Sequence, residues 1–355
     1  MHRLRATLDG LSVHYAGLPH FPRNFTRDSI VSALICGDPD LLGEQLGFCA
    51  GRQGCAADPR TGEEPGKIFH EWPGYPLRGL STAYNACDTT ALFLIGHAAY
   101  RRMGGDPALA ETQAPALRKA VGYILAHLKD GLFLEDPGAC GASRFALKVT
   151  YWKDSVVWAR PDGEPDWPAA FTLAQAQNLC ALRAARGLLG TRELDTPAQG
   201  MLAAMQELWD PSSGTLLMAL DRKGPIRGVS SDALHALYYL EPGDLSSEQA
   251  GQIARSSEVL ETPAGYRTLD PALAAHLKSG YHARTVWPFE QALLHAAALR
   301  FDLPHVAEVA GRVMPFLDTD PEILTLEDGE IRKGGCDPQL WTLAAKRYFG
   351  GLPGP

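Results

Sequence analysis

Residues 88–95 read Asp88-Thr89-Thr90-Ala91-Leu92-Phe93-Leu94-Ile95, and this stretch decides the fold that the sequence predicts. Its first three residues can open a helix, and the residues that follow are apolar on every side. A helix that is apolar all round belongs in the interior of a protein. The next helical pattern, from Ala114 to Leu128, is amphipathic and belongs on the outside. The pair therefore predicts an inner helix followed by an outer helix that returns.

The same order recurs along the whole chain. A long loop, an apolar helix, a short turn and an amphipathic helix occur six times, at intervals of roughly 50 to 80 residues, and the last copy is truncated. Strand signals are scarce, and Asp28 or Ser29 can cap the first helix. The predicted helices cover residues 27–35, 40–52, 88–95, 114–128, 171–189, 196–209, 233–240, 246–260, 287–301, 304–317 and 336–348.

Six inner helices wrapped by outer ones would close into an (α/α)6 barrel, so the predicted fold class is all-α. The long loops would then all lie at the end where the inner helices begin. An α-solenoid or an irregular helical bundle is the alternative. Loops of this length are uncommon unless they are functional, which favours a barrel with one active face. No linker rich in Pro, Gly or Ser separates two parts, so we expect one domain over residues 1–355.

Composition narrows the possible partners and the compartment. The net charge of −8 argues against a nucleic-acid partner, and no apolar run approaches the roughly 20 residues that cross a bilayer. Residues 1–9 contain no apolar signal core. The seven cysteines are odd in number and fall mostly in helical patterns, which is typical of reduced thiols. We therefore expect a cytoplasmic protein without a nucleic-acid or membrane partner.

The long loop over residues 131–168 contains Val149-Thr150-Tyr151-Trp152-Lys153-Asp154-Ser155. Here the Asp154 carboxyl stands beside an indole and an ammonium group. Burial against an aromatic wall raises the pKa of a carboxyl, whereas a lysine lowers it. That balance suits an acid that holds a proton near neutral pH and then gives it away. Taken alone, such a stretch is more often a solvated loop carboxylate, and the comparable loops elsewhere are what favour an active role.

The long loops also concentrate aromatic residues near carboxylates, amides and arginines. This composition is the one that sugar recognition uses, because an aromatic face stacks on a sugar ring while polar groups bind its hydroxyls. The alternative for any single tryptophan is core packing. The aromatic residues of the loops are Trp72, Trp152, Trp158, Trp167, Trp287, Tyr75, Tyr84, Tyr151 and Tyr281.

Cleavage of a glycosidic bond needs two carboxyl groups, one on each side of the sugar plane. Asp154 is the first candidate. The second should come from another loop on the same face, and spacing does not choose among the candidates because they lie on different loops. These candidates are Glu71, Glu290, Glu322, Glu327 and Glu330.

Motifs that span nearly the whole chain resemble those of the amylo-α-1,6-glucosidase-like six-hairpin glycosidases. They occur in the family's order. The chain is similar, too, to the glycoside hydrolase family that holds processing α-glucosidases and the bacterial mannosylglycerate and glucosylglycerate hydrolases. The motifs are Phe21-Pro22-Arg23-Asn24-Phe25-Thr26-Arg27-Asp28-Ser29, Lys67-Ile68-Phe69-His70-Glu71, Asp88-Thr89-Thr90-Ala91-Leu92-Phe93-Leu94, Trp152-Lys153-Asp154-Ser155, Gly265-Tyr266-Arg267-Thr268-Leu269, Tyr281-His282, Thr285-Val286-Trp287-Pro288 and Pro338-Gln339-Leu340-Trp341.

The resemblance implies an (α/α)6 barrel that hydrolyses an α-glycoside with inversion. It implies that Asp154 is the general acid and that Glu322, in the Pro321-Glu322 pair, is the general base, with Glu327 and Glu330 as the alternatives. In an inverting enzyme the two carboxyl groups are about 6.5 to 9.5 Å apart. The substrate-binding residues that the resemblance implies are Arg27, Asp28, His70, Glu71, Trp72, Asp88, Trp152, Lys153, Gln177, His282, Trp287 and Gln339.

Three departures from the family pattern bear on the substrate. Gln175 stands where relatives often carry a glutamate, and Ala283 stands where an asparagine is usual. No counterpart of the β-rich N-terminal domain of debranching enzymes precedes the motifs. These departures disfavour glycogen and fit a small glycoside, such as a sugar linked to glycerate or glycerol.

Four other activities compete with this interpretation. They are amylo-α-1,6-glucosidase-like action on α-glucans, a phosphorylase, an epimerase of free sugars, and a non-catalytic sugar-binding protein. A phosphorylase needs a cationic phosphate pocket where the base would sit. We expect no cofactor and no metal, because sugar contacts or core packing explain His70, Glu71 and His282 better than metal binding does. The expected partner is a small carbohydrate.

Overall fold

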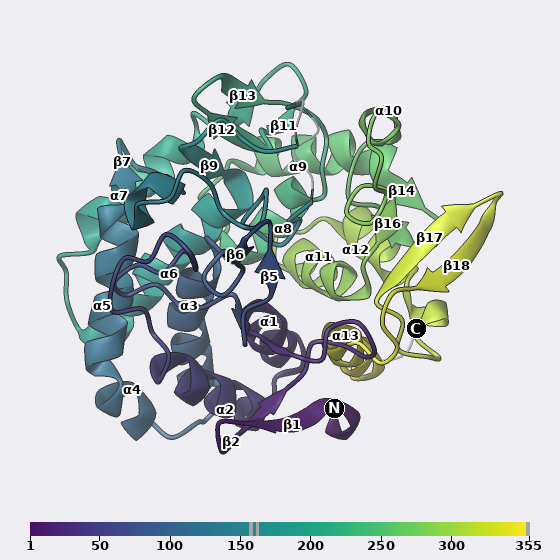
Figure 1. Cartoon of the computed structure of the whole chain (residues 1–355). Coiled ribbons are helices and arrows are strands. Elements are labelled where there is room, and N and C mark those ends of the chain that lie inside the picture. The colour runs from purple at the N-terminus through teal and green to yellow at the C-terminus, as the bar shows by residue number, and fades with distance from the viewer. Residues whose placement is uncertain (156–158, 161–162, 353–355) are drawn as a thin grey trace.

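The computed structural model describes residues 1–155, 159–160 and 163–352. Within these residues the chain forms thirteen α-helices, and six of them contact one another in sequence order. The last of the six contacts the first, so they form a closed ring (Figure 1). The ring helices are α1 (Thr26–Cys36), α3 (Thr89–Arg102), α6 (Thr172–Leu189), α8 (Asp232–Tyr239), α11 (Pro288–Arg300) and α13 (Leu340–Gly350).

Outer helices pack against the ring, which confirms the predicted alternation of inner and outer helices. The inner helix α3 is buried along nearly its whole length, from Thr89 to Ala99. Its outer partner α5 buries one face, since Leu117, Val121 and Ile124 recur at helical spacing. The outer helices are α2 (Pro39–Ala50), α4 (Ala108–Thr112), α5 (Ala114–Ala126), α7 (Asp195–Met205), α9 (Ser247–Ser256) and α12 (Pro304–Gly311), and a short α10 (Pro271–Ala274) lies in a loop.

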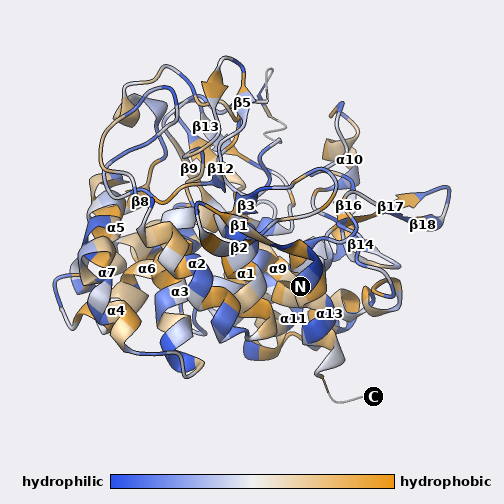
Figure 2. Ribbon diagram, turned by 60° about the horizontal axis from the view of Figure 1, so that its bottom comes forward, coloured by the Kyte–Doolittle hydropathy of each residue, from blue (hydrophilic) through white to orange (hydrophobic). Residues whose placement is uncertain are grey.

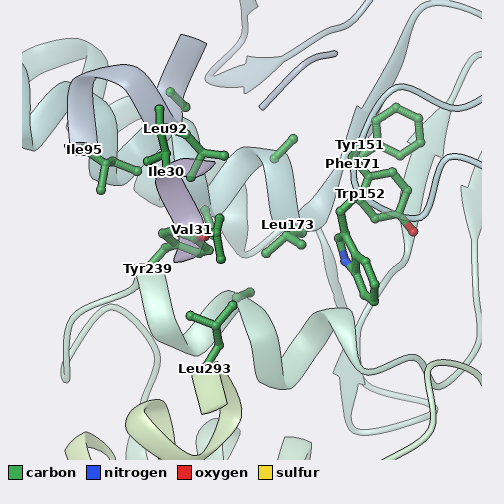
Figure 3. Packing of buried hydrophobic residues seen from close by; sticks show 14 of the residues in the cluster. Ile30, Val31, Leu92, Ile95, Tyr151, Trp152, Phe171, Leu173, Tyr239 and Leu293 are labelled. Carbon is green, nitrogen blue, oxygen red and sulfur yellow. The ribbon is translucent and has the colours of Figure 1, made fainter. Parts of the chain in front are cut away.

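The centre of the ring is packed with apolar side chains. Figure 3 shows Ile30, Leu92, Leu173, Tyr239 and Leu293, from five ring helices, converging on one another. Close packing of this kind holds the helices at fixed positions, so it also fixes where each inner helix begins.

The predicted all-α class is correct for the ring of helices but incomplete, because the described residues also form short strands that gave little signal in the sequence. Short strands fill the long loops and lie together at one end of the helices (Figure 2). Most have two or three residues, too few for the alternation by which a strand is recognised in a sequence. The strands are β1 (Arg5–Leu8), β2 (Leu11–His14), β3 (Asn24–Phe25), β4 (Glu71–Trp72), β5 (Pro76–Leu77), β6 (Leu80–Ser81), β7 (Leu128–Lys129), β8 (Leu132–Phe133), β9 (Ala169–Phe171), β10 (Trp209–Asp210), β11 (Thr215–Leu216), β12 (Ala219–Asp221), β13 (Gly224–Ile226), β14 (Glu261–Thr262), β15 (Gly265–Tyr266), β16 (Thr285–Val286), β17 (Ile323–Glu327) and β18 (Glu330–Gly334).

Strand pairing sets where the ring helices start. β3 pairs with β4 and runs directly into α1, so Phe25 is the N-cap of α1 and Asp28 lies inside its first turn. The prediction that Asp28 or Ser29 caps this helix is therefore wrong. In the same way β16 leads into α11, whose N-cap is Trp287. β16 pairs with β17, whose hairpin with β18 projects from the body beside α13 (Figure 1).

The N-terminal segment is joined to the start of the last helix by main-chain hydrogen bonds. The amide of Leu18 donates to the carbonyl of Pro338, and the amide of Leu340 donates to the carbonyl of Ala16. Gly17 also forms a bridge with Gln339, and a Cβ on Gly17 would lie 2.7 Å from Cys336 Cβ, so the two segments approach too closely for a larger residue.

Each of the seven cysteines carries a free thiol, as predicted. Among the helices formed by the described residues, none has both the length and the apolar character needed to cross a membrane.

Candidate active site

A cavity of about 130 Å³ opens at the end of the ring where the inner helices begin. Its walls come from the starts of α1, α11 and α13 and from the loops between them. Helices whose first turns meet at one place bring residues that are distant in sequence into a single site. The lining residues are Ala16, Phe21, Phe25, Arg27, Asp28, His70, Trp152, Asp154, Tyr281, His282, Trp287, Glu322, Gln339 and Trp341.

Glu322 is the most tightly held carboxylate of the cavity. The residue is 1% exposed, and its Oε1 accepts hydrogen bonds from the Tyr281 hydroxyl and, at 3.3 Å, from Gln339 Nε2. The backbone amide of Cys336 donates to Oε2 at 2.8 Å. Burial raises the pKa of Glu322, and the donated hydrogen bonds oppose that rise. Three donors fix the carboxylate in one orientation toward the cavity.

Gly335 makes this arrangement possible. Its φ of +76° is in the left-handed region, and a Cβ added there would lie 2.3 Å from Glu322 Oε2. A side chain at position 335 would therefore displace the Glu322 carboxylate from the backbone amide of Cys336.

Asp154 also lines the cavity, and its side chain is 32% exposed. Burial raises its pKa to about 7; Arg27 opposes this rise, and the negative charges of Glu71, Asp88 and Glu322 add to it. The Nδ1 atom of His282 is 3.6 Å from its Oδ1. A carboxyl group with this pKa is substantially protonated near neutral pH and can donate its proton.

Arg27 and Asp28 supply the polar floor of the cavity from the first turn of α1. The guanidinium of Arg27 binds both carboxylate oxygens of Asp88, with Nε–Oδ2 and Nη2–Oδ1 distances of 2.7 and 2.9 Å. This bidentate pair holds the arginine rigidly. Burial raises the pKa of Asp28 to about 8, so this carboxyl carries a proton near neutral pH and can donate a hydrogen bond to a ligand.

Two histidines of the cavity are neutral near pH 7. Burial, together with Lys153 and Arg27, lowers the pKa of His282 to about 3. Its ring stacks on Trp287 at a centroid distance of 5.1 Å, and its Nδ1 lies 2.7 Å from Ser155 Oγ. Burial also lowers the pKa of His70 well below its usual value, and its Nδ1 has no partner among the described residues. Both rings can therefore serve as neutral hydrogen-bonding groups.

The remaining walls are aromatic. The Trp287 ring meets those of Trp152 and Trp341 edge to face, at centroid distances of 5.7 and 5.5 Å. Trp341 in turn stacks on Phe289 at 4.1 Å. These mutual contacts fix the rings in place, so the cavity presents rigid apolar faces beside its carboxyl groups.

Nine of the residues implied by the family resemblance line the cavity, and five do not. Asp88 and Glu71 lie behind it: Asp88 binds Arg27, and Glu71 accepts hydrogen bonds from Arg23 and Thr82. The nine that line it are Arg27, Asp28, His70, Trp152, Asp154, His282, Trp287, Glu322 and Gln339.

The structure places Trp72, Lys153 and Gln177 away from the cavity walls. The Trp72 indole donates to Asp9 at 3.2 Å, because Trp72 and Glu71 are neighbours in a strand and point to opposite faces. Lys153 is buried, and its ammonium binds Ser230 Oγ. Gln177 is buried within α6.

Glu327 and Glu330, the alternatives to Glu322, pair with each other beside the turn of the β17–β18 hairpin and are exposed. Glu290 is buried and accepts a hydrogen bond from Ser231. Trp158 lies outside the described residues. Of the glutamates considered, Glu322 is therefore the one that the described structure brings to the cavity.

Several lining residues are not among the site residues that the sequence predicts. Phe21 and Phe25 flank Arg23 in the first motif, Tyr281 precedes His282, and Trp341 ends the last motif. Each of these residues lies within one of the family motifs, so membership of a motif is the sequence feature that could have identified it as a site residue. Strand pairing decides which side of each loop faces the cavity, and this pairing cannot be inferred from the sequence.

No protein-family model matches this chain, and no curated protein sequence matches it. It is similar in structure to a solved GH63 mannosylglycerate hydrolase from Thermus thermophilus in complex with Tris and D-glycerate, with a TM-score of 0.71 and 14% sequence identity, over 98% of this chain and 97% of that one.

Two further structures agree. The same Thermus thermophilus hydrolase in complex with glucose aligns with a TM-score of 0.67 and 13% identity, over 96% of both chains. A rhamnosidase from Klebsiella oxytoca with rhamnose bound aligns with a TM-score of 0.63 and 17% identity, over 95% of this chain and 59% of that one. The resemblance predicted from the sequence motifs is thus confirmed at the level of the fold, which this chain shares with glycosidases.

Proposed function

We propose that this chain is a single-domain (α/α)6-barrel glycoside hydrolase that cleaves an α-linked glycoside with inversion. The observation that carries the proposal is that Asp154 and Glu322, from different loops, line one small cavity whose other walls are aromatic. Two carboxyl groups beside stacking surfaces are the minimum that glycoside hydrolysis requires. The closed ring of six helices and the resemblance to glycosidase structures support the fold part of the proposal.

In the proposed reaction, Asp154 protonates the glycosidic oxygen while the bond from that oxygen to the anomeric carbon breaks. A water molecule attacks the anomeric carbon from the opposite face and gives its proton to Glu322. The raised pKa of Asp154, at about 7, supports the acid role. The three hydrogen bonds on Glu322 support the base role, because a base must hold its orientation toward one water.

The proposed substrate is small: a glucosyl or mannosyl glycerate or glycerol, or a short α-glucoside. Pockets for drug-sized ligands begin at about 300 Å³, and this cavity has about 130 Å³. Such a volume suits a terminal sugar held by Arg27, Asp28, His70 and Gln339. The hydrolase structures with D-glycerate and with glucose support a carbohydrate of this size.

Phosphorolysis is less well supported than hydrolysis. Among the described lining residues, Arg27 is the one with a cationic side chain near neutral pH, and Asp88 binds it in a bidentate pair. A phosphate ion beside Glu322 would therefore meet negative charge, and the described lining residues offer it no unpaired cation.

Anomer-resolved proton NMR tests the proposal. The purified protein would be mixed in turn with glucosylglycerate, mannosylglycerate, glucosylglycerol, isomaltose, trehalose and a limit dextrin. Release of the β-anomer from one α-glycoside is the expected result, with no acceleration by phosphate. The Glu322→Gln variant should lose about 100-fold or more of that activity. Initial release of the α-anomer would overturn inversion, and binding without turnover would favour a non-catalytic sugar-binding protein.

A further inference from the structure

Asp232 is a buried aspartate at the first position of the ring helix α8 and does not line the cavity. Its carboxylate binds the side chains of three consecutive residues. Oδ2 accepts from the Tyr151 hydroxyl at 3.0 Å, and Oδ1 accepts from the Trp152 indole at 3.0 Å. The Lys153 ammonium lies 3.0 Å from Oδ1. The residue that follows these three is Asp154.

We propose that Asp232 is a positioning residue that holds the Tyr151–Lys153 segment so that the Asp154 carboxyl points at the glycosidic oxygen. The inference rests on the proposed function and deepens it. Three bonds from consecutive side chains to one carboxylate fix both the path and the rotation of the main chain that leads into Asp154. The Trp152 indole is fixed as well, so its ring stays on the cavity wall.

The surroundings of Asp232 are built to keep this carboxylate charged and immobile. Ser230 Oγ donates to Oδ2 at 2.8 Å, and the Lys153 ammonium also binds Ser230 Oγ, Ser231 Oγ and the Thr268 carbonyl at 2.8 to 3.0 Å. Although burial opposes it, the ammonium of Lys153 holds the pKa of Asp232 below its usual value. Because removing one partner of a buried ion pair leaves the other charge unpaired, Asp232 and Lys153 each depend on the other to stay in place.

A misdirected Asp154 should affect substrates differently according to their leaving group. An alkoxide leaving group must receive a proton from Asp154 as the bond breaks, whereas fluoride leaves without one. A variant that only misdirects Asp154 therefore slows cleavage of an alkyl glycoside and spares cleavage of the glycosyl fluoride. A variant that weakens the whole fold slows both by the same factor.

The experiment compares Asp232→Asn with the wild-type chain on the α-glycoside identified by NMR and on the α-fluoride of the same sugar. We expect kcat on the glycoside to fall about 10- to 100-fold and kcat on the fluoride to change less than about threefold, because only the former needs the acid. The matched control is Asp210→Asn, which removes a carboxylate that is buried to the same degree and bound by Ser212, Ser213 and Arg227, away from the cavity. It should leave the ratio of the two rates unchanged.

Tyr151→Phe provides a second, milder variant should Asp232→Asn fail to fold. It removes one hydrogen bond to Asp232 without changing charge, and it should shift the ratio of the two rates in the same direction by about threefold or more. Equal losses on both substrates, or no loss on either, would overturn the role of Asp232 and leave the proposed hydrolysis standing. A wild-type chain that cleaves neither substrate would overturn the proposed function, and this role with it.

Discussion

The hydroxyl of Tyr281 donates a hydrogen bond to Oε1 of Glu322, across 41 positions of sequence. This bond favours the charged form of the carboxylate and lowers its pKa against the effect of burial. Tyr281 comes from the loop before β16, whereas Glu322 immediately precedes β17, and these two strands pair. The sheet that joins the strands therefore also aligns the donor with the carboxylate that we assign as the base.

Tyr281→Phe should lower kcat/KM about 10- to 100-fold, since a hydrogen bond to a charged group contributes about 1.5–3 kcal/mol. The pKa of Glu322 should rise, so the acidic limb of the pH profile should move to higher pH. Steady-state rates across a pH series measure both effects. Tyr84→Phe is the control, because it removes a buried tyrosine's hydrogen bond to the Arg52 carbonyl outside the cavity lining. An unshifted acidic limb in Tyr281→Phe would count against Glu322 as the base.

The pH profile of kcat/KM should be bell-shaped and fall as the pH rises through about 7. The sign follows from the roles: Asp154 must be protonated to act as the acid, and its pKa is raised to about 7. Glu322 must be deprotonated, so activity should rise with pH through its raised pKa. On the glycosyl fluoride, which needs no acid, the alkaline limb should be absent. If the alkaline limb near pH 7 persisted with the fluoride, the limb would report the titration of another group, such as Asp28.

Gly335→Ala should lower both stability and activity. A left-handed backbone costs a residue other than glycine about 1 to 2 kcal/mol, and here the new methyl group would also collide with Glu322 Oε2. Gly329→Ala is the matched control, since Gly329, in the turn of the β17–β18 hairpin that precedes Gly335, has a φ of +82° and nothing within 4 Å of its added Cβ. Thermal unfolding should show a loss of stability in both variants and a larger loss in Gly335→Ala because of the collision, with activity lost only in Gly335→Ala. Equal activity in the two would mean that the carboxylate tolerates displacement.

Arg27→Lys should destabilise the chain and remove most activity. A lysine cannot reproduce the bidentate contact with Asp88. Because breaking a buried ion pair costs about 3–5 kcal/mol of folding stability, that range is the upper limit for this variant. Arg183→Lys is the control, because Arg183 makes a bidentate pair with Asp244 that is more exposed and outside the cavity. Chemical denaturation and kcat/KM would be measured for both. Comparable losses in the two variants would show that the Arg27 pair has no special role at the cavity.

The inner helices and several cavity residues could be predicted from the sequence, and the orientation of loop side chains could not. The apolar run of α3 predicts burial at each of its positions, and each of them is buried. The family resemblance favours Glu322 but leaves Glu327 and Glu330 as alternatives, and of the three Glu322 is the one that lines the cavity. Trp72 and Glu71 are different, because a strand of two residues has no alternation from which to infer its faces. The exposure of Glu327 likewise depends on the register of the β17–β18 hairpin, which the sequence does not reveal.

The main-chain bonds between residues 16–18 and 337–340 have a consequence for biosynthesis. Translation delivers Arg27 and Asp28 early and Gln339 and Trp341 more than 300 positions later, yet all four line the same cavity. A nascent chain can assemble the early hairpins as they emerge, but its binding pocket stays open on one side until α13 docks beside α1. If the chain acts as proposed, its site is therefore complete only after the contact between α1 and α13 has formed.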